Sequence, residues 1–164
     1  MKTGAAKAWF IVGTITLIFA GGLHALLALR DTVDPTAFAP IDGSVKTAME
    51  GTGVRLVGEA TPSMWSAWLG FNIGFGLGVF AFGLLCLLVA THDFKLVERI
   101  GAIRPLTIAV SATYFAISIG FFFSGPAIIT GIATVCFTIA AVLSVAGRRG
   151  EAARSADHHP GRRP

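Results

Sequence analysis

The stretch AWLGFNIGFGLGVFAFGLLCLLVA, residues 67–90, determines the class of fold. Over 24 residues it contains no Asp, Glu, Lys or Arg. A helix rises about 1.5 Å per residue, so roughly 20 apolar residues are needed to cross the hydrocarbon core of a bilayer. The stretch therefore predicts a membrane-spanning helix, with Pro62 suited to its first turn.

Two further charge-free stretches extend this prediction on either side. Residues 8–29 match the length of one span, whereas residues 105–147 are about twice as long as a span requires. Ser124-Gly125-Pro126 divides the longer stretch, because glycine suits the end of a helix and proline the start of the next. We therefore expect an all-α membrane fold, a four-transmembrane-helix bundle with helices at about 8–29, 62–90, 105–125 and 126–146.

The overall composition agrees with this class of fold. Of the 164 residues, 54% are hydrophobic and 13% are charged, whereas soluble domains carry about 25% charged residues. This composition excludes an ordinary cytosolic globule and a disordered chain. We expect one transmembrane domain over 1–147, followed by a basic, disordered cytoplasmic tail over 148–164.

The basic residues indicate the orientation of the helices. The loop 30–64 contains five acidic residues and only Arg30, Lys46 and Arg55 as basic residues, so we expect it to form one long external loop. Both termini are then cytoplasmic, as in a multi-pass protein of the bacterial inner membrane, and the net charge of +4 indicates topology rather than a nucleic-acid partner. A cleaved signal peptide is the alternative for residues 8–29, although this apolar run exceeds the usual length of about 7–15 residues. Ten basic residues lie on the side opposite the loop: Lys2, Lys7, Lys95, Arg99, Arg104, Arg148, Arg149, Arg154, Arg162 and Arg163.

Each expected helix carries one polar residue at a similar depth. These residues are His24, Asn72, Ser118 and Thr130. An unsatisfied polar group in hydrocarbon costs several kcal/mol, so all four side chains should face inward and find partners. Two interpretations remain open: a shallow polar pocket that opens outward, and a hydrogen-bonded clamp between helices.

The second helix also carries a stripe of small residues and an aromatic start. Gly70, Gly74 and Gly78 recur every four residues, a spacing that lets two helix backbones approach closely in lipid. Their partner is either the first helix of the same chain or another copy, which would give a homo-oligomer or a larger complex. Trp65 and Trp68 suit the membrane interface as anchors.

We find no pattern that indicates a catalytic residue, a metal site or a cofactor. Cys86 and Cys136 form no CxxC pair, and their depths differ by roughly 10 Å, too far for a disulfide. His92 lies roughly 25–30 Å from the level of His24, so the two cannot ligate one haem. A haem held by His24 of two copies remains an alternative. No carboxylate lies within a span, which argues against a proton- or sodium-coupled transporter.

The run Trp65-Ser66-Ala67-Trp68-Leu69-Gly70-Phe71-Asn72 resembles the W-x-x-W-x-G-F-N signature of an uncharacterised family of small bacterial four-helix membrane proteins. The resemblance covers the first two helices and the loop between them. It implies a four-span fold with a substantial first external loop, and no established activity. The family typically has Ser-His-Ser where this chain has Gly74-Phe75-Gly76, so a second histidine near His24 is missing here.

These observations predict a non-enzymatic integral membrane protein, a structural or accessory subunit of the inner membrane. The first alternative is binding of a small molecule, a quinone or a lipid in a pocket around His24 and Asn72. The second is a membrane redox enzyme, which the missing CxxC and the missing histidine pair disfavour.

Overall fold

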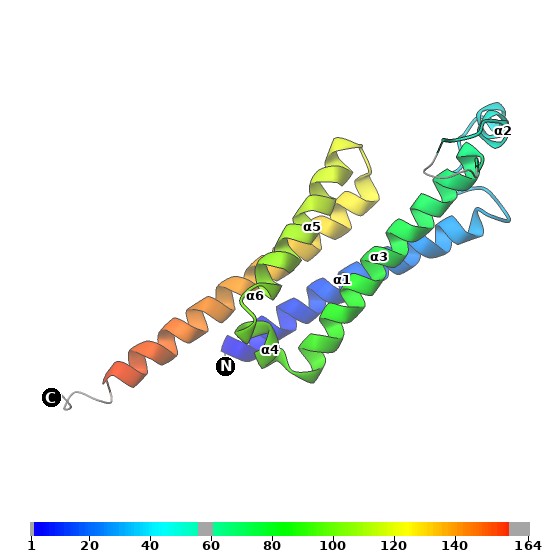
Figure 1. The fold of residues 1–164 in the computed structure, drawn as a ribbon. Helices are drawn as coiled ribbons and strands as arrows, with labels where there is room; N and C mark the ends of the chain where they lie inside the picture. The colour runs from blue at the N-terminus through cyan, green and yellow to red at the C-terminus, as the bar shows by residue number, and fades with distance from the viewer. Residues whose placement is uncertain (1, 56–60, 158–164) are drawn as a thin grey trace. The chain divides into compact units, whose positions relative to one another are not determined.

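The computed structural model describes residues 2–55 and 61–157, and these residues are almost entirely helical (Figure 1). The four predicted long helices are confirmed, since α1, α3, α5 and α6 each contain a segment long and apolar enough to cross a membrane. The described elements are α1 (Lys2–Arg30), α2 (Gly43–Gly51), α3 (Met64–His92), α4 (Phe94–Arg99), α5 (Ile103–Gly120) and α6 (Ser124–Asp157).

The chain divides into two compact units. Residues 18–82 form one, here called the α1–α3 unit, and residues 1–17 with 83–164 form the other, here called the α5–α6 unit. The helices α1 and α3 each contribute residues to both units.

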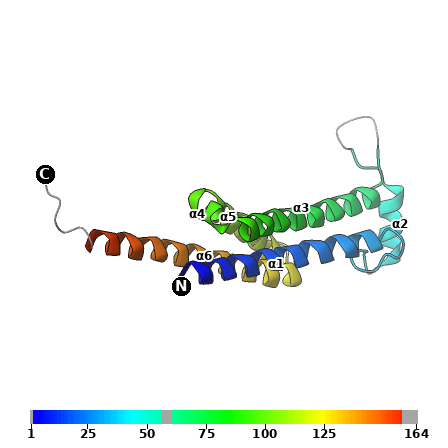
Figure 2. The same cartoon turned by 90° about the horizontal axis from the view of Figure 1, so that it is seen from below.

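Two glycines bring the backbones of α1 and α3 together in the α1–α3 unit, where the two helices run side by side (Figure 2). A Cβ atom on Gly76 would lie 2.6 Å from the backbone nitrogen of Ala25. A Cβ atom on Gly21 would meet the backbone of Phe80 and the carbonyl oxygen of Gly76. Only glycine fits at both positions, so the packing of these helices depends on this pair.

The segment between α1 and α3 is ordered by its own hydrogen bonds. Asp42 caps α2, since its carboxylate accepts a hydrogen bond from the backbone N–H of Ser44 at 2.8 Å. The chain returns to α3 through backbone hydrogen bonds from Val54 to Pro62 and from Met64 to Thr52. The long loop predicted over residues 30–64 therefore contains a short helix, α2.

The α5–α6 unit is built on a helical hairpin and a cluster of phenylalanines. Gly131 of α6 faces the ring of Phe115 on α5, because a Cβ atom at Gly131 would lie 3.1 Å from that ring. The ring of Phe10 on α1 packs edge-on against Phe137 of α6 and Phe94 of α4, with centroids 5.2 and 5.9 Å apart. These contacts place the amphipathic α4 against the unit through Phe94.

The turn between α5 and α6 lies earlier than predicted. Helix α5 ends at Gly120, whereas we expected it to end at residue 125. The turn consists of Phe121–Phe123. Phe122 takes the left-handed conformation with φ 59°, and the N–H of Phe123 donates to the carbonyl of Ser118 at 2.8 Å. Such a bond closes a helix C-terminus without glycine at the left-handed position. Ser124-Gly125-Pro126 therefore begins α6 instead of forming the turn.

The last helix extends well beyond residue 146, where we expected it to end. It continues through Asp157, so residues 148–157 of the expected disordered tail are helical. Six of the ten residues of this segment are Ala or Arg, which favour helix, so it continues the span in the same conformation. The remainder of the expected tail, residues 158–164, lies outside the described residues.

Candidate functional site

His24 and Asn72 meet within the α1–α3 unit. The Nε2 atom of His24 lies 3.2 Å from the Oδ1 atom of Asn72, and Asn72 Nδ2 donates to the carbonyl of Trp68 at 2.8 Å. Because that carbonyl requires a donor, it orients the amide with Oδ1 toward His24. Oδ1 only accepts, so the imidazole donates through Nε2–H.

Aromatic rings enclose the imidazole. The ring centroid of His24 lies 4.6 Å from that of Phe38 and 5.0 Å from that of Phe75. The indole Nε1–H of Trp68 donates to the carbonyl of Phe38 at 3.0 Å, which ties the loop to α3. We call His24, Phe38, Trp68, Asn72 and Phe75 the His24 cluster. It joins α1, α3 and the loop after α1.

Asp31 holds this loop in place. The residue is completely buried, and its carboxylate accepts three backbone hydrogen bonds, from Thr36 and Ala37 at 2.9 Å and from Phe38 at 2.6 Å. Burial alone raises the pKa of Asp31, but the three N–H donors and the nearby positive charge of Arg30 outweigh it, so the pKa lies below its ordinary value. The carboxylate thereby fixes Phe38 against His24.

In the sequence, Asp31 is one of the five acidic residues of the loop 30–64, and no motif marks it as a loop anchor. Its position directly after the last residue of α1 is a signal that could have identified it, because an aspartate there can accept N–H groups from the following turn. Pro35 and Pro40, which follow it, are consistent with an irregular segment that needs such a partner.

Ser118 and Thr130 belong to the α5–α6 unit and bond within their own helices. Ser118 donates its hydroxyl to the carbonyl of Tyr114 at 2.8 Å, and Thr130 donates to that of Pro126 at 2.7 Å. Both side chains are buried. Of the four polar residues expected at one level, the described contacts therefore join only His24 and Asn72.

The predicted glycine stripe is not the face of α3 that meets α1. A Cβ atom on Gly70, Gly74 or Gly78 would have no described atom within 4 Å, and all three residues are exposed. The helix α1 instead meets Gly76, which lies between two members of the stripe. The sequence allowed the stripe to pack either against the first helix of the same chain or against another copy. The structure does not show the first of these arrangements.

The two expected interface tryptophans have different environments. Trp65 is buried at 8% exposure, with the ammonium group of Lys46 5.4 Å from its ring centroid, so α2 covers it. Trp68 remains 40% exposed while it bonds to Phe38, as suits an interface anchor.

Neither of two shallow hollows formed by the described residues is lined by a residue of the His24 cluster. One shallow hollow is lined by Pro62, Ser66, Ala67, Gly70 and Phe71 of α3 and the residues before it, and the other lies on α6. Among the described residues, no group of three His, Cys, Asp or Glu side chains is placed to hold a metal ion. The arrangement at His24 is therefore a direct interhelical hydrogen bond packed between aromatic rings.

Comparison with known proteins returns no matching family model, no matching curated protein and no matching solved structure. The four long apolar helices define the class, a multi-pass integral membrane protein. The candidate site in this chain is a polar contact within the α1–α3 unit, in which His24 bonds to Asn72 and Asn72 bonds to the carbonyl of Trp68.

Proposed function

We propose that this chain is a non-enzymatic structural or accessory subunit of the bacterial inner membrane, with both termini in the cytoplasm. The observation that carries the proposal is the direct bond from His24 to Asn72. An ionisable residue within a span usually serves a substrate or a proton. Here the Nε2–H of His24 donates a hydrogen bond to Asn72 of α3, and the imidazole ring contacts the rings of Phe38 and Phe75.

The exposed glycine stripe supports an accessory role. Gly70, Gly74 and Gly78 leave a smooth face on α3 that no atom of the described chain covers within 4 Å of an added Cβ. A helix from a second copy or from another membrane protein could approach such a face closely, where dispersion drives association in lipid.

A test of the accessory role uses the chain extracted from its own membrane in polymer-bounded lipid discs. We expect a stable complex with a second copy or another membrane protein, which Gly74→Leu dissociates. The matched control is Leu106→Ala, which changes an exposed residue of α5, a different helix from the one that carries the stripe, and should leave the complex intact. A chain that runs as a monomer before and after Gly74→Leu would contradict an accessory role through this face.

The orientation is tested by a reporter enzyme active only outside the cytoplasm. We expect no activity when it is fused after Pro164 and activity when it is inserted in α2, because the basic residues favour the cytoplasmic side. Activity of the fusion at Pro164 would overturn the proposed topology.

The alternative function, binding of a quinone or a similar apolar molecule at His24, rests on the aromatic rings around the imidazole. A bound carbonyl would have to replace Asn72 as the partner of Nε2–H. Titration of the purified protein with ubiquinone, monitored by quenching of Trp68 fluorescence, distinguishes the two. Saturable quenching that His24→Leu abolishes would favour the alternative, and its absence favours the accessory role.

A further inference from the structure

Two buried polar atoms of the α5–α6 unit have no hydrogen-bond partner among the described residues. They are Nη1 of Arg104 and Oγ of Ser144. Arg104 is 8% exposed and Ser144 is 3% exposed. Leaving such atoms unpaired destabilises the folded protein, and the cost is larger for a charged group than for a neutral one. Each therefore requires an explanation.

Ser144 differs from the other buried hydroxyls of the described chain. Each of those donates to a carbonyl three or four residues earlier on its own helix, the usual arrangement in a membrane-spanning segment. Ser144 forms no such bond, so its hydroxyl is available to a group outside the helix. The five residues that bond in this way are Thr14, Thr107, Ser111, Ser118 and Thr130.

Both unpartnered atoms lie beside Arg148. Ser144 and Arg148 are four residues apart on α6 and so share one face of that helix. The positive charge of Arg148 also acts on the guanidinium of Arg104 at the start of α5. The contact between Gly131 and Phe115 sets an antiparallel register that brings the start of α5 level with this part of α6.

Within the part of the chain whose side chains are described, no carboxylate forms an ion pair with these arginines. The negative charge of Glu98 acts on Arg104, but none of the described carboxylates forms an ion pair with that guanidinium. A buried cation beside a like charge is destabilised unless an anion joins it. A phosphate oxygen could accept hydrogen bonds from Arg104 and Ser144 while the exposed Arg148 binds another oxygen. The cluster thus has the charge and the donors for a phosphate.

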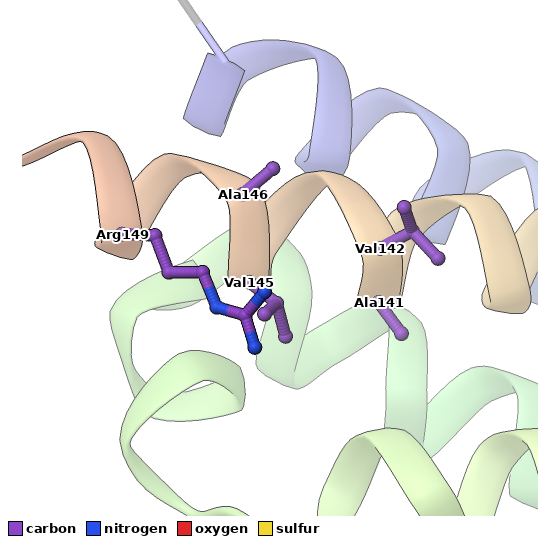
Figure 3. A pocket seen from close by; sticks show the side chains of 5 residues that line it. All are labelled: Ala141, Val142, Val145, Ala146 and Arg149. Atoms are coloured by element: carbon purple, nitrogen blue, oxygen red, sulfur yellow. The ribbon is translucent and has the colours of Figure 1, made fainter.

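The neighbouring surface of α6 is largely apolar, which bears on the kind of molecule that would bring a phosphate to these residues. Ala141, Val142, Val145 and Ala146 line a shallow apolar hollow, and the guanidinium of Arg149 lies beside Val145 (Figure 3). An apolar hollow with Arg149 at its edge, on the same helix as Ser144 and Arg148, suits an acyl chain beneath an anionic headgroup. We propose that Arg104, Ser144 and Arg148 bind the phosphate of an anionic phospholipid whose acyl chain lies in this hollow.

The test is a lipid titration of the full chain in detergent, stripped of lipid and monitored by native mass spectrometry. Phosphatidylglycerol and phosphatidylcholine with identical acyl chains serve as probes. We expect phosphatidylglycerol to bind about tenfold more tightly than phosphatidylcholine, because the choline cation of the latter offsets the charge of its phosphate and is repelled by the arginines. Arg104→Gln and Arg148→Gln should each remove this preference, and Ser144→Ala should reduce it.

Arg99→Gln is the matched control, because it removes an exposed arginine of α4 and should retain the preference. If Arg104→Gln does not give a folded protein, the exposed Arg148→Gln decides the result by itself. An unchanged preference in Arg148→Gln would overturn the proposal. Loss of the preference in millimolar inorganic phosphate would also overturn it, because the site would then bind free phosphate rather than a lipid.

Discussion

The His24 cluster and the cluster of Arg104, Ser144 and Arg148 differ in how their polar atoms are hydrogen-bonded. At His24, three hydrogen bonds join the cluster within the chain: Nε2 donates to Asn72, the Asn72 amide donates to the carbonyl of Trp68, and the indole of Trp68 donates to the carbonyl of Phe38. At Arg104, two buried atoms have no hydrogen-bond partner among the described residues. The difference indicates that the first cluster stabilises the fold by itself, whereas the second is complete only with an added anion.

The largest effect should come from the close approach of α1 and α3 that brings the His24 cluster together. Gly76→Ala places a methyl group 2.6 Å from the backbone of Ala25, so the helices must separate. We expect a loss of about 3 kcal/mol in the free energy of unfolding, measured by denaturant titration in detergent. Gly74→Ala, with open space around its Cβ, is the control and should be nearly neutral. Equal losses in both variants would refute this packing.

The next effect concerns Asp31, which fixes Phe38 over His24. Asp31→Asn removes a charged acceptor of three N–H groups, and we expect a loss of about 2 kcal/mol at neutral pH. The folded pKa of Asp31 is lowered, so its contribution is full above its ordinary value near 3.8 and is lost as the pH falls through the folded value.

The melting temperature measured between pH 7 and pH 3 checks this contribution. Wild type should lose more stability over this range than Asp31→Asn. Asp34→Asn is the control, because it affects only an exposed pair with Arg30 and should cost less than about 0.5 kcal/mol. A parallel pH dependence in wild type and Asp31→Asn would show that Asp31 does not hold the loop.

A smaller effect is expected at Ser144, where a substitution should increase the free energy of unfolding instead of decreasing it. In lipid-free protein, Ser144→Ala removes an unpartnered hydroxyl and should raise the free energy of unfolding by about 1 kcal/mol. Ser118→Ala removes a buried hydroxyl that bonds to Tyr114 and should lower it slightly. Chemical unfolding of the two variants side by side measures the contrast. If Ser144→Ala is the less stable of the two, Ser144 has a partner within the fold.

The smallest effect should come from the surface of α2. Lys46 forms an ion pair with Glu50 one turn away and also lies over the ring of Trp65. Glu50→Gln should change stability by less than about 0.5 kcal/mol, because such pairs are exposed to solvent and screened by salt. A loss above about 1 kcal/mol in thermal unfolding would show that the ion pair on α2 stabilises the α1–α3 unit more than a solvent-exposed pair does.

Much of the fold could be predicted from the sequence, because charge-free runs of span length report directly on the helices. Two helix ends could not be placed. The end of α5 depends on the left-handed Phe122, a conformation for which the sequence offers no glycine. The end of α6 depends on residues 148–157, whose charges suggest a solvated tail while their helix propensities favour continuation.

The site was predicted in part, for a related reason. Depth along a helix could be calculated from residue numbers, so the pairing of His24 with Asn72 was accessible from the sequence. Contacts around the helix axis were not accessible, so the stripe of Gly70, Gly74 and Gly78 was noted while the packing pair Gly21 and Gly76 depends on the observed rotation of α3. Arg104 and Ser144 are unremarkable in the sequence, because the lack of a partner is visible only in three dimensions.

The central claim, that His24 and Asn72 form a structural clamp, is tested most directly by a double-mutant cycle with His24→Leu, Asn72→Leu and the double variant. The free energy of unfolding would be measured in detergent without added ligand. We expect each single variant to be destabilised and the pair to show a coupling energy of about 1 kcal/mol, as interhelical hydrogen bonds in membrane proteins do. A coupling energy near zero, with the single effects strictly additive, would contradict the clamp.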